Sequence, residues 1–147
     1  MRAVALLRRA RDHLGQRGPF LLFMGVGKVC FGAGMIAEPP VLDGLGLLTR
    51  FAPLHCWALV WIVAGVATFA CAWLRFGRDR FGFLAASVPP SFWAFAYLWA
   101  AVIGDYARGL WIFLWYITSH CGVIWCASRV APLTRRRKRP GAGRRPG

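Results

Sequence analysis

Four long apolar runs constrain this chain more than any other feature of its sequence. They cover approximately residues 19–37, 54–74, 82–103 and 110–127. A helix of about 20 residues reaches across the ~30 Å hydrocarbon core of a bilayer. Each run can therefore cross a membrane as a single helix. The sequence predicts an all-α, polytopic membrane protein with a four-helix transmembrane domain over residues 19–127.

The small number of charged residues favours the same fold class. Charged residues make up 16% of the chain, against about 25% in a typical soluble domain. The formal net charge is nevertheless +14, because only 5 residues are acidic. Nucleic-acid-binding proteins carry their basic residues on a folded polar face, whereas these cations flank apolar runs, as they do in membrane proteins. We therefore expect the partner to be a bilayer with anionic lipids rather than nucleic acid.

The positions of the 19 lysines and arginines predict the orientation of the chain. Sixteen of them lie before the first run, between the second and third runs, or after the fourth. Only Arg50 and Arg108 lie in the two opposite loops, and Lys28 lies inside the first run. Loops rich in lysine and arginine stay in the cytoplasm. We expect a multi-pass protein of the cell membrane with both ends cytoplasmic.

Two shorter amphipathic segments accompany the spans. Residues 1–18 carry apolar side chains on one helical face and arginines elsewhere, which predicts a basic helix lying in the membrane interface. The loop over residues 38–53 is too rich in leucine for a plain water-exposed loop, and a short helix on the outer surface is expected there.

The C-terminal residues, 128–147, consist largely of arginine, proline and glycine, which predicts a disordered cytoplasmic tail. The tail contains a run of five cations: Arg135, Arg136, Arg137, Lys138 and Arg139. Each cation near an anionic leaflet contributes about 1 kcal/mol to binding. This run is interpreted either as a contact site for anionic lipid, nucleic acid or an acidic partner, or as a topological anchor.

Lys28 is the most unusual residue within a span. It lies ~13 Å along the first helix, near the expected bilayer centre, where a lysine costs roughly 2.5–3.5 kcal/mol. His120 falls at a similar depth in the fourth run, next to Thr118 and Ser119. One interpretation is a mid-membrane polar site on a proton or ion path. The other is that Lys28 extends toward the inner face while His120 makes a single structural hydrogen bond.

Glycine, proline and tryptophan residues predict how the helices pack. The four glycines Gly25, Gly27, Gly32 and Gly34 would allow a neighbouring helix to approach the first span closely. The pair Pro89-Pro90 should either kink the third span or end a short initial segment. The deeper tryptophans are expected to pack between helices: Trp61, Trp93 and Trp115.

No pattern of catalytic or metal-binding residues is present in the sequence. His55 and His120 differ by roughly 14 Å in depth along their helices, so they do not share a metal. The 5 cysteines lack the spacing of a zinc site. Three acidic residues lie in the outer loops, Glu38, Asp43 and Asp105, and nothing in the sequence fixes their geometry. We expect no enzymatic activity, cofactor or metal.

Three segments carry a family resemblance: Pro53–Trp61, Arg108–Trp111 and Thr118–Gly122. With them the middle of the chain resembles small, uncharacterised multi-pass membrane proteins of actinobacteria and their phages. For a phage protein, the resemblance implies a holin, a small membrane protein with a charged tail. We expect a non-enzymatic role through helix association, either holin-like or as an accessory membrane component. Such a role would involve a homo-oligomer. The alternative is a small transporter or channel that uses Lys28 and His120.

Overall fold

A computed structural model describes residues 17–41, 43–74 and 79–129, and in these residues all regular structure is helical. The elements are α2 (Gly18–Ala37), α3 (Gly46–Phe51), α4 (Leu54–Cys71), α5 (Arg80–Val102), α6 (Gly109–Trp115), the π-helical segment η1 (Tyr116–Gly122) and α7 (Val123–Arg129). The last three form one continuous helix, called the fourth helix below. Four helices are long and apolar enough to span a membrane: α2, α4, α5 and the fourth helix. At this level the predicted fold class is confirmed.

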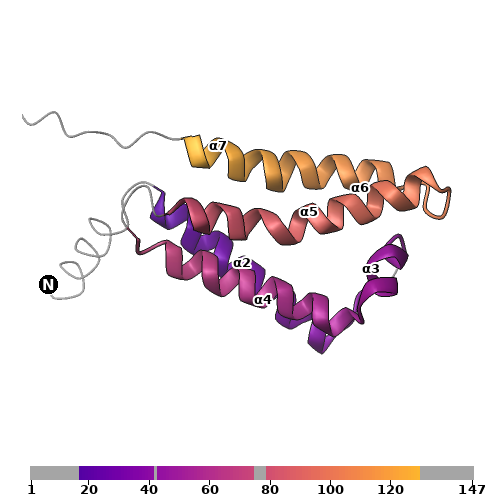
Figure 1. Cartoon of the computed structure of the whole chain (residues 1–147), viewed down its shortest axis with the longest axis horizontal. Helices are drawn as coiled ribbons and strands as arrows, with labels where there is room; N and C mark the ends of the chain where they lie inside the picture. The colour runs from indigo at the N-terminus through magenta and orange to yellow at the C-terminus, as the bar shows by residue number, and fades with distance from the viewer. Residues whose placement is uncertain (1–16, 42, 75–78, 130–147) are drawn as a thin grey trace, which may run out of the picture.

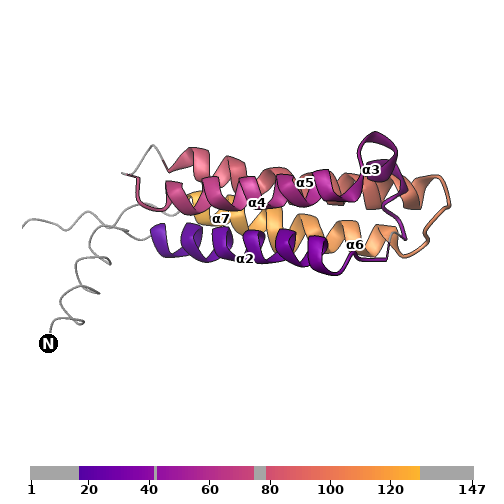
Figure 2. The ribbon, with the colours of Figure 1, turned by 90° about the horizontal axis from the view of Figure 1, so that it is seen from below.

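The four long helices run side by side with alternating direction (Figure 1). One end of the bundle, called the basic end, holds the first residues of α2 and α5 and the last residues of α4 and α7. The loop end holds α3 and the turn between α5 and α6. Along the chain, α2 packs against α4, α4 against α5, and α5 against the fourth helix. Figure 2 shows α2 and the fourth helix on the same side of the α4–α5 pair.

The observed helices begin and end within a few residues of the predicted spans. The second span was expected to reach residue 74, but α4 ends at Cys71 and a turn follows it. The helix expected over residues 1–18 and the tail expected over residues 128–147 lie almost entirely outside the described residues. The short helix expected in the loop of residues 38–53 is present as α3. The Trp57 indole Nε1–H fixes α3 by donating a hydrogen bond of 2.9 Å to the Leu48 carbonyl oxygen.

The bundle has a mixed core of small and large residues, and it exposes many large apolar side chains. Its buried core contains many alanines together with Leu21, Trp61 and Trp93. Large apolar side chains are exposed on all four long helices, and on the fourth helix only 11% of the most apolar window is buried. A water-soluble monomer rarely exposes so much contiguous apolar surface. The bundle surface therefore suits an apolar surrounding.

Two glycines of α2 allow its backbone to touch the backbone of α4. A Cβ atom on Gly25 would lie 2.7 Å from the Phe69 nitrogen, and one on Gly32 would lie 2.7 Å from the Ala58 oxygen. By contrast, a Cβ atom on Gly27 or Gly34 would meet nothing within 4 Å. The predicted close approach thus holds for two of the four glycines, which occur seven residues apart on one face of α2.

Helix α5 continues through Pro89 and Pro90, both of which are buried. A short initial segment that ends at the prolines, one of the two predicted alternatives, is therefore not what forms. The two prolines have no N–H, so the carbonyls of Ala85 and Ala86 lose their usual helical donors.

Candidate functional site

A cavity of about 250 Å³ separates α2 and α4 from the fourth helix. Lys28 on α2, Trp61 on α4 and His120 on η1 are among its lining residues. The remaining lining residues are mostly aromatic: Phe23, Met24, Gly27, Phe31, Trp115 and Tyr116. We call this space the Lys28 cavity.

The Lys28 ammonium group is buried without a hydrogen-bond partner. The residue is 3% exposed, and no atom of the described residues accepts a hydrogen bond from its Nζ. Nζ lies 4.9 Å from the centroid of the Trp61 ring, so a cation–π contact provides part of the missing stabilisation. An ammonium group has three N–H donors, and the ring face satisfies none of them by a conventional hydrogen bond. Lys28 does not extend to the basic end, as the alternative interpretation required.

Trp61 brings a second unpartnered donor to the same cavity. Its indole Nε1–H is also buried without an acceptor in the described residues. Other rings hold it in place: Phe31 at a centroid distance of 4.5 Å and Trp93, edge-on, at 5.4 Å. No aspartate or glutamate lines the cavity. The Lys28 cavity therefore holds two unpartnered donors and no carboxylate in the described residues.

His120 reaches the cavity from a π-helical turn. Such wider turns are rare and are frequently found at functional sites. The Ser119 hydroxyl donates its single proton to the Trp115 carbonyl oxygen and lies 2.9 Å from His120 Nδ1. In the tautomer that carries its proton on Nδ1, the imidazole donates to this hydroxyl, and Ser119 leaves Nε2 unengaged. The rings of Trp115 and Tyr116 flank the imidazole at 4.9 and 5.1 Å.

Of the residues predicted for a polar site, the structure brings Lys28 and His120 to one cavity, and Ser119 contacts His120. Thr118 is exposed and does not line the cavity; its hydroxyl donates back to the Leu114 carbonyl oxygen. Trp115 was expected to pack between helices, as Trp61 and Trp93 do, but it is 55% exposed. The cationic run over residues 135–139 lies outside the described residues.

Two features of this site could not be predicted from the sequence. Trp61 looked like a packing residue, and only the structure reveals its buried N–H without an acceptor. The π-helical segment was also unexpected, since nothing in residues 116–122 marks a change of helical hydrogen bonding. The sequence signals for the site itself were Lys28 within the first apolar run and the grouping of Thr118, Ser119 and His120 within the fourth.

The structure brings two of the three loop acids to one cavity and leaves Glu38 outside it. At the loop end, Asp43 and Asp105 line one cavity of about 640 Å³ together with Arg50 and Tyr106. Both carboxylates and the guanidinium group belong to exposed residues. Within residues 17–41, 43–74 and 79–129 no three His, Cys, Asp or Glu side chains gather as a metal site. His55 is exposed at the start of α4 and does not line the Lys28 cavity.

The Lys28 cavity thus combines a buried ammonium group, an indole N–H and an imidazole within an aromatic wall. Comparison of the chain with protein-family models, with curated proteins and with solved structures finds no match. The chemistry of the cavity is consequently the basis on which a function is inferred.

Proposed function

We propose that this chain is an integral membrane protein with four transmembrane helices and both ends in the cytoplasm, and that it binds and passes small anions at the Lys28 cavity. Its four long apolar helices and their exposed apolar side chains support insertion. The excess of arginine and lysine at the basic end supports the orientation. The proposal includes an interfacial helix over residues 1–18 and lipid contacts at residues 135–139. Reporter fusions at each loop would test the orientation directly.

The observation that carries the anion proposal is the pair of unpartnered donors, Lys28 Nζ and Trp61 Nε1. A buried cation without a counter-charge is strongly destabilising. An anion would supply both the charge and the acceptor lone pairs, and His120 Nε2 could add a third contact once protonated. A cation would find no carboxylate in the cavity.

The aromatic lining favours a particular class of anion. Much of the lining consists of apolar groups such as the rings of Phe23 and Phe31, which replace water poorly around an ion. Strongly hydrated anions would lose the most hydration free energy when they enter the cavity. We therefore expect weakly hydrated monovalent anions, such as iodide or nitrate, to be preferred over chloride.

A liposome assay tests this proposal. The purified chain would be reconstituted in neutral phosphatidylcholine vesicles that contain a halide-sensitive dye. Wild-type protein should conduct iodide faster than chloride, and Lys28→Leu should abolish the flux. His55→Gln is the matched control, because His55 is exposed at the loop end. Flux that is selective for potassium, or that is unchanged in Lys28→Leu, would contradict the anion proposal.

A holin-like role through helix association is the second candidate. The observation that favours it is the fourth helix, which leaves Leu110, Trp111 and Trp125 exposed along its length. Such a surface can contact lipid or the same helix in a second copy. Cell lysis on induced expression that persists in Lys28→Leu would favour this candidate over the anion path.

A further inference from the structure

A second cavity, at the basic end of the bundle, gathers three arginines from three helices. It has a volume of about 370 Å³ and is called the basic cavity here. Arg17 immediately precedes α2, Arg80 is the first residue of α5, and Arg129 is the last residue of α7. Its remaining lining residues are Phe83, Leu84, Ser87, Ile124, Trp125 and Ser128. Residues far apart in the sequence thus build one positively charged site.

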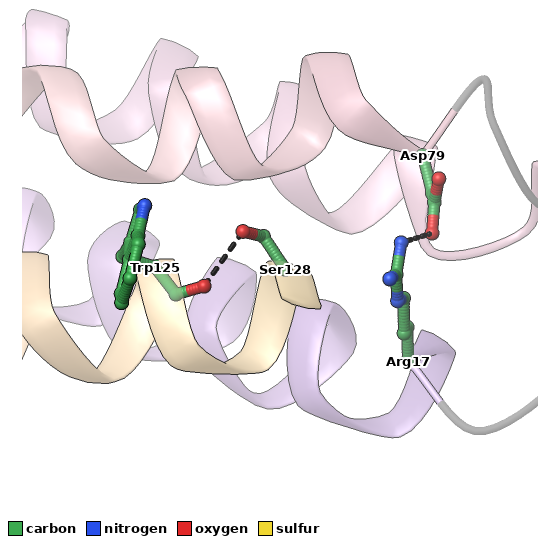
Figure 3. Close-up of polar contacts among 4 residues, drawn as sticks. All are labelled: Arg17, Asp79, Trp125 and Ser128. Carbon is green, nitrogen blue, oxygen red and sulfur yellow. Dashed lines mark hydrogen bonds and ion pairs between the residues drawn. The ribbon is translucent and has the colours of Figure 1, made fainter. Parts of the chain in front are cut away.

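One carboxylate fixes this site without neutralising it. Arg17 Nη1 lies 3.5 Å from Asp79 Oδ2, and both side chains are largely buried (Figure 3). Asp79 is the only acidic residue at the basic end among the described residues. The charges of three arginines are thus balanced by one aspartate, which contacts Arg17. The cavity therefore keeps an excess of positive charge. The ion pair ties the start of α2 to the start of α5.

The two exposed arginines, Arg80 and Arg129, stack on aromatic rings. Arg129 Cζ lies 5.0 Å from the centroid of the Trp125 ring, and Arg80 Cζ lies 5.0 Å from that of Phe81. A cation–π contact uses none of the guanidinium N–H groups in a conventional hydrogen bond, so they stay available for a bidentate contact. Planar guanidinium forks match the oxygens of a phosphate group.

The serine hydroxyls of the cavity are already engaged as donors. Ser128 donates 2.7 Å to the Trp125 carbonyl oxygen, and Ser87 donates 2.9 Å to the Phe83 carbonyl oxygen. Figure 3 shows Ser128 beside Trp125 near the end of α7. A bound anion would therefore depend on Arg80 and Arg129 for its hydrogen bonds.

The basic cavity also has apolar lining residues beside its arginines. Ile124 is buried at its base, whereas Leu84 and Trp125 are 63% and 60% exposed at its side. The site thus has cations at the helix ends and an open apolar surface beside them. An amphiphile with an anionic head matches this arrangement, whereas free phosphate would leave the apolar surface without a partner.

We propose that the basic cavity binds the phosphate headgroup of an anionic phospholipid of the cytoplasmic leaflet. Arg80 and Arg129 hold the phosphate, and the upper acyl chain lies along Leu84 and Trp125. Basic pockets between transmembrane helices on the cytoplasmic side recognise anionic headgroups in this way. The inference rests on the membrane insertion and orientation proposed above, but not on anion passage at Lys28.

Native mass spectrometry of the full chain released from detergent tests this site. Wild-type protein should retain phosphatidylglycerol in preference to phosphatidylcholine. The double variant Arg80→Gln/Arg129→Gln should retain it roughly 30-fold more weakly, since two cations near the headgroup are removed. The matched control is Arg50→Gln/Arg108→Gln, which removes two exposed arginines from the loop end and should leave retention unchanged. Circular dichroism would establish that both double variants keep their helices.

Three results would overturn the proposal: equal retention of the two lipids, equal weakening by the control pair, or displacement of phosphatidylglycerol by inorganic phosphate at comparable concentration. The last result would identify a free-phosphate site instead. The two proposals fail separately, because Lys28→Leu should retain phosphatidylglycerol normally. The Arg80→Gln/Arg129→Gln protein should likewise keep anion flux in phosphatidylcholine vesicles.

Discussion

Helix α2 packs backbone to backbone against α4 on one side and faces the fourth helix across a cavity on the other. Glycine serves opposite purposes on the two sides. Gly25 and Gly32 bring α2 into contact with α4, whereas Gly27 lines the Lys28 cavity and meets no neighbouring atom within 4 Å of a Cβ position. The α4 side is therefore a structural contact, and the side toward the fourth helix is the one with room for a ligand.

The largest loss of stability is expected when alanine replaces the two glycines of α2 that contact α4. In Gly25→Ala/Gly32→Ala, each methyl group would meet α4 backbone atoms 2.7 Å away, which cannot move independently of the helix. Overpacking typically costs about 1–3 kcal/mol per site, so the free energy of unfolding in detergent should fall by several kcal/mol. Thermal denaturation would measure the loss.

The matched control for this substitution is Gly27→Ala/Gly34→Ala on the same helix. Neither methyl group would meet an atom within 4 Å, and alanine is the better helix former. The unfolding temperature should stay the same or rise. Equal destabilisation by both pairs would show that α2 does not distinguish its two sides.

On the side of α2 that faces the cavity, Lys28→Leu should raise stability and remove transport. Removal of a buried ammonium group without a hydrogen-bond partner should stabilise the inserted helix by about 2.5–3.5 kcal/mol on insertion scales. The same substitution should abolish anion flux. A gain in stability together with a loss of transport, measured by thermal denaturation and the liposome assay, would mark Lys28 as a functional residue; destabilisation would mark it as a packing residue.

Two tryptophan substitutions should have opposite effects on stability and on anion flux. Trp61→Phe removes a buried N–H that has no acceptor, whereas Trp57→Phe removes one that donates 2.9 Å to the Leu48 carbonyl oxygen. An unsatisfied buried donor is costly and a satisfied one contributes about 1 kcal/mol. Trp61→Phe should leave stability unchanged or raise it while it lowers anion flux, and Trp57→Phe should lower stability and leave flux unchanged. Identical effects in the two assays would contradict the assignment of Trp61 to the site.

The smallest effect is expected at Ser119. Ser119→Ala removes the acceptor that holds His120 Nδ1 at 2.9 Å, so the imidazole orientation should loosen. A hydrogen bond of about 0.5–1 kcal/mol corresponds to a severalfold loss of anion affinity or less. Thr118→Ala serves as the control, because this exposed hydroxyl contacts only backbone carbonyls of its own helix. Liposome flux titrated against iodide concentration would separate the two variants.

Helix number and helix position could be predicted from the sequence, since both follow from local composition and length. The four apolar runs correspond to α2, α4, α5 and the fourth helix within a few residues. The shared depth of Lys28 and His120 was also accessible, because rise per residue fixes depth once helices are antiparallel.

The rotation of each helix about its own axis could not be predicted from the sequence. Most of the features that the sequence did not predict depend on this rotation. Apolar residues occur on all sides of each run, so composition does not reveal which face meets a neighbour. The assignment of Gly25 to the α4 contact and Gly27 to the cavity depends on that rotation. So do the exposure of Trp115 and the meeting of Arg17, Arg80 and Arg129 at one cavity.

The π-helical turns of Tyr116–Gly122 have a geometric consequence for the residues beyond them. A π turn accommodates about one residue more than an α turn, and one residue corresponds to about 100° of rotation at 3.6 residues per turn. The wide turns therefore rotate α7 about the helix axis and determine which of its side chains face the bundle. Rewinding them into α-helix would swing Trp125 and Arg129 around the helix axis and away from the basic cavity, so the segment that carries His120 also sets the direction in which those two side chains point.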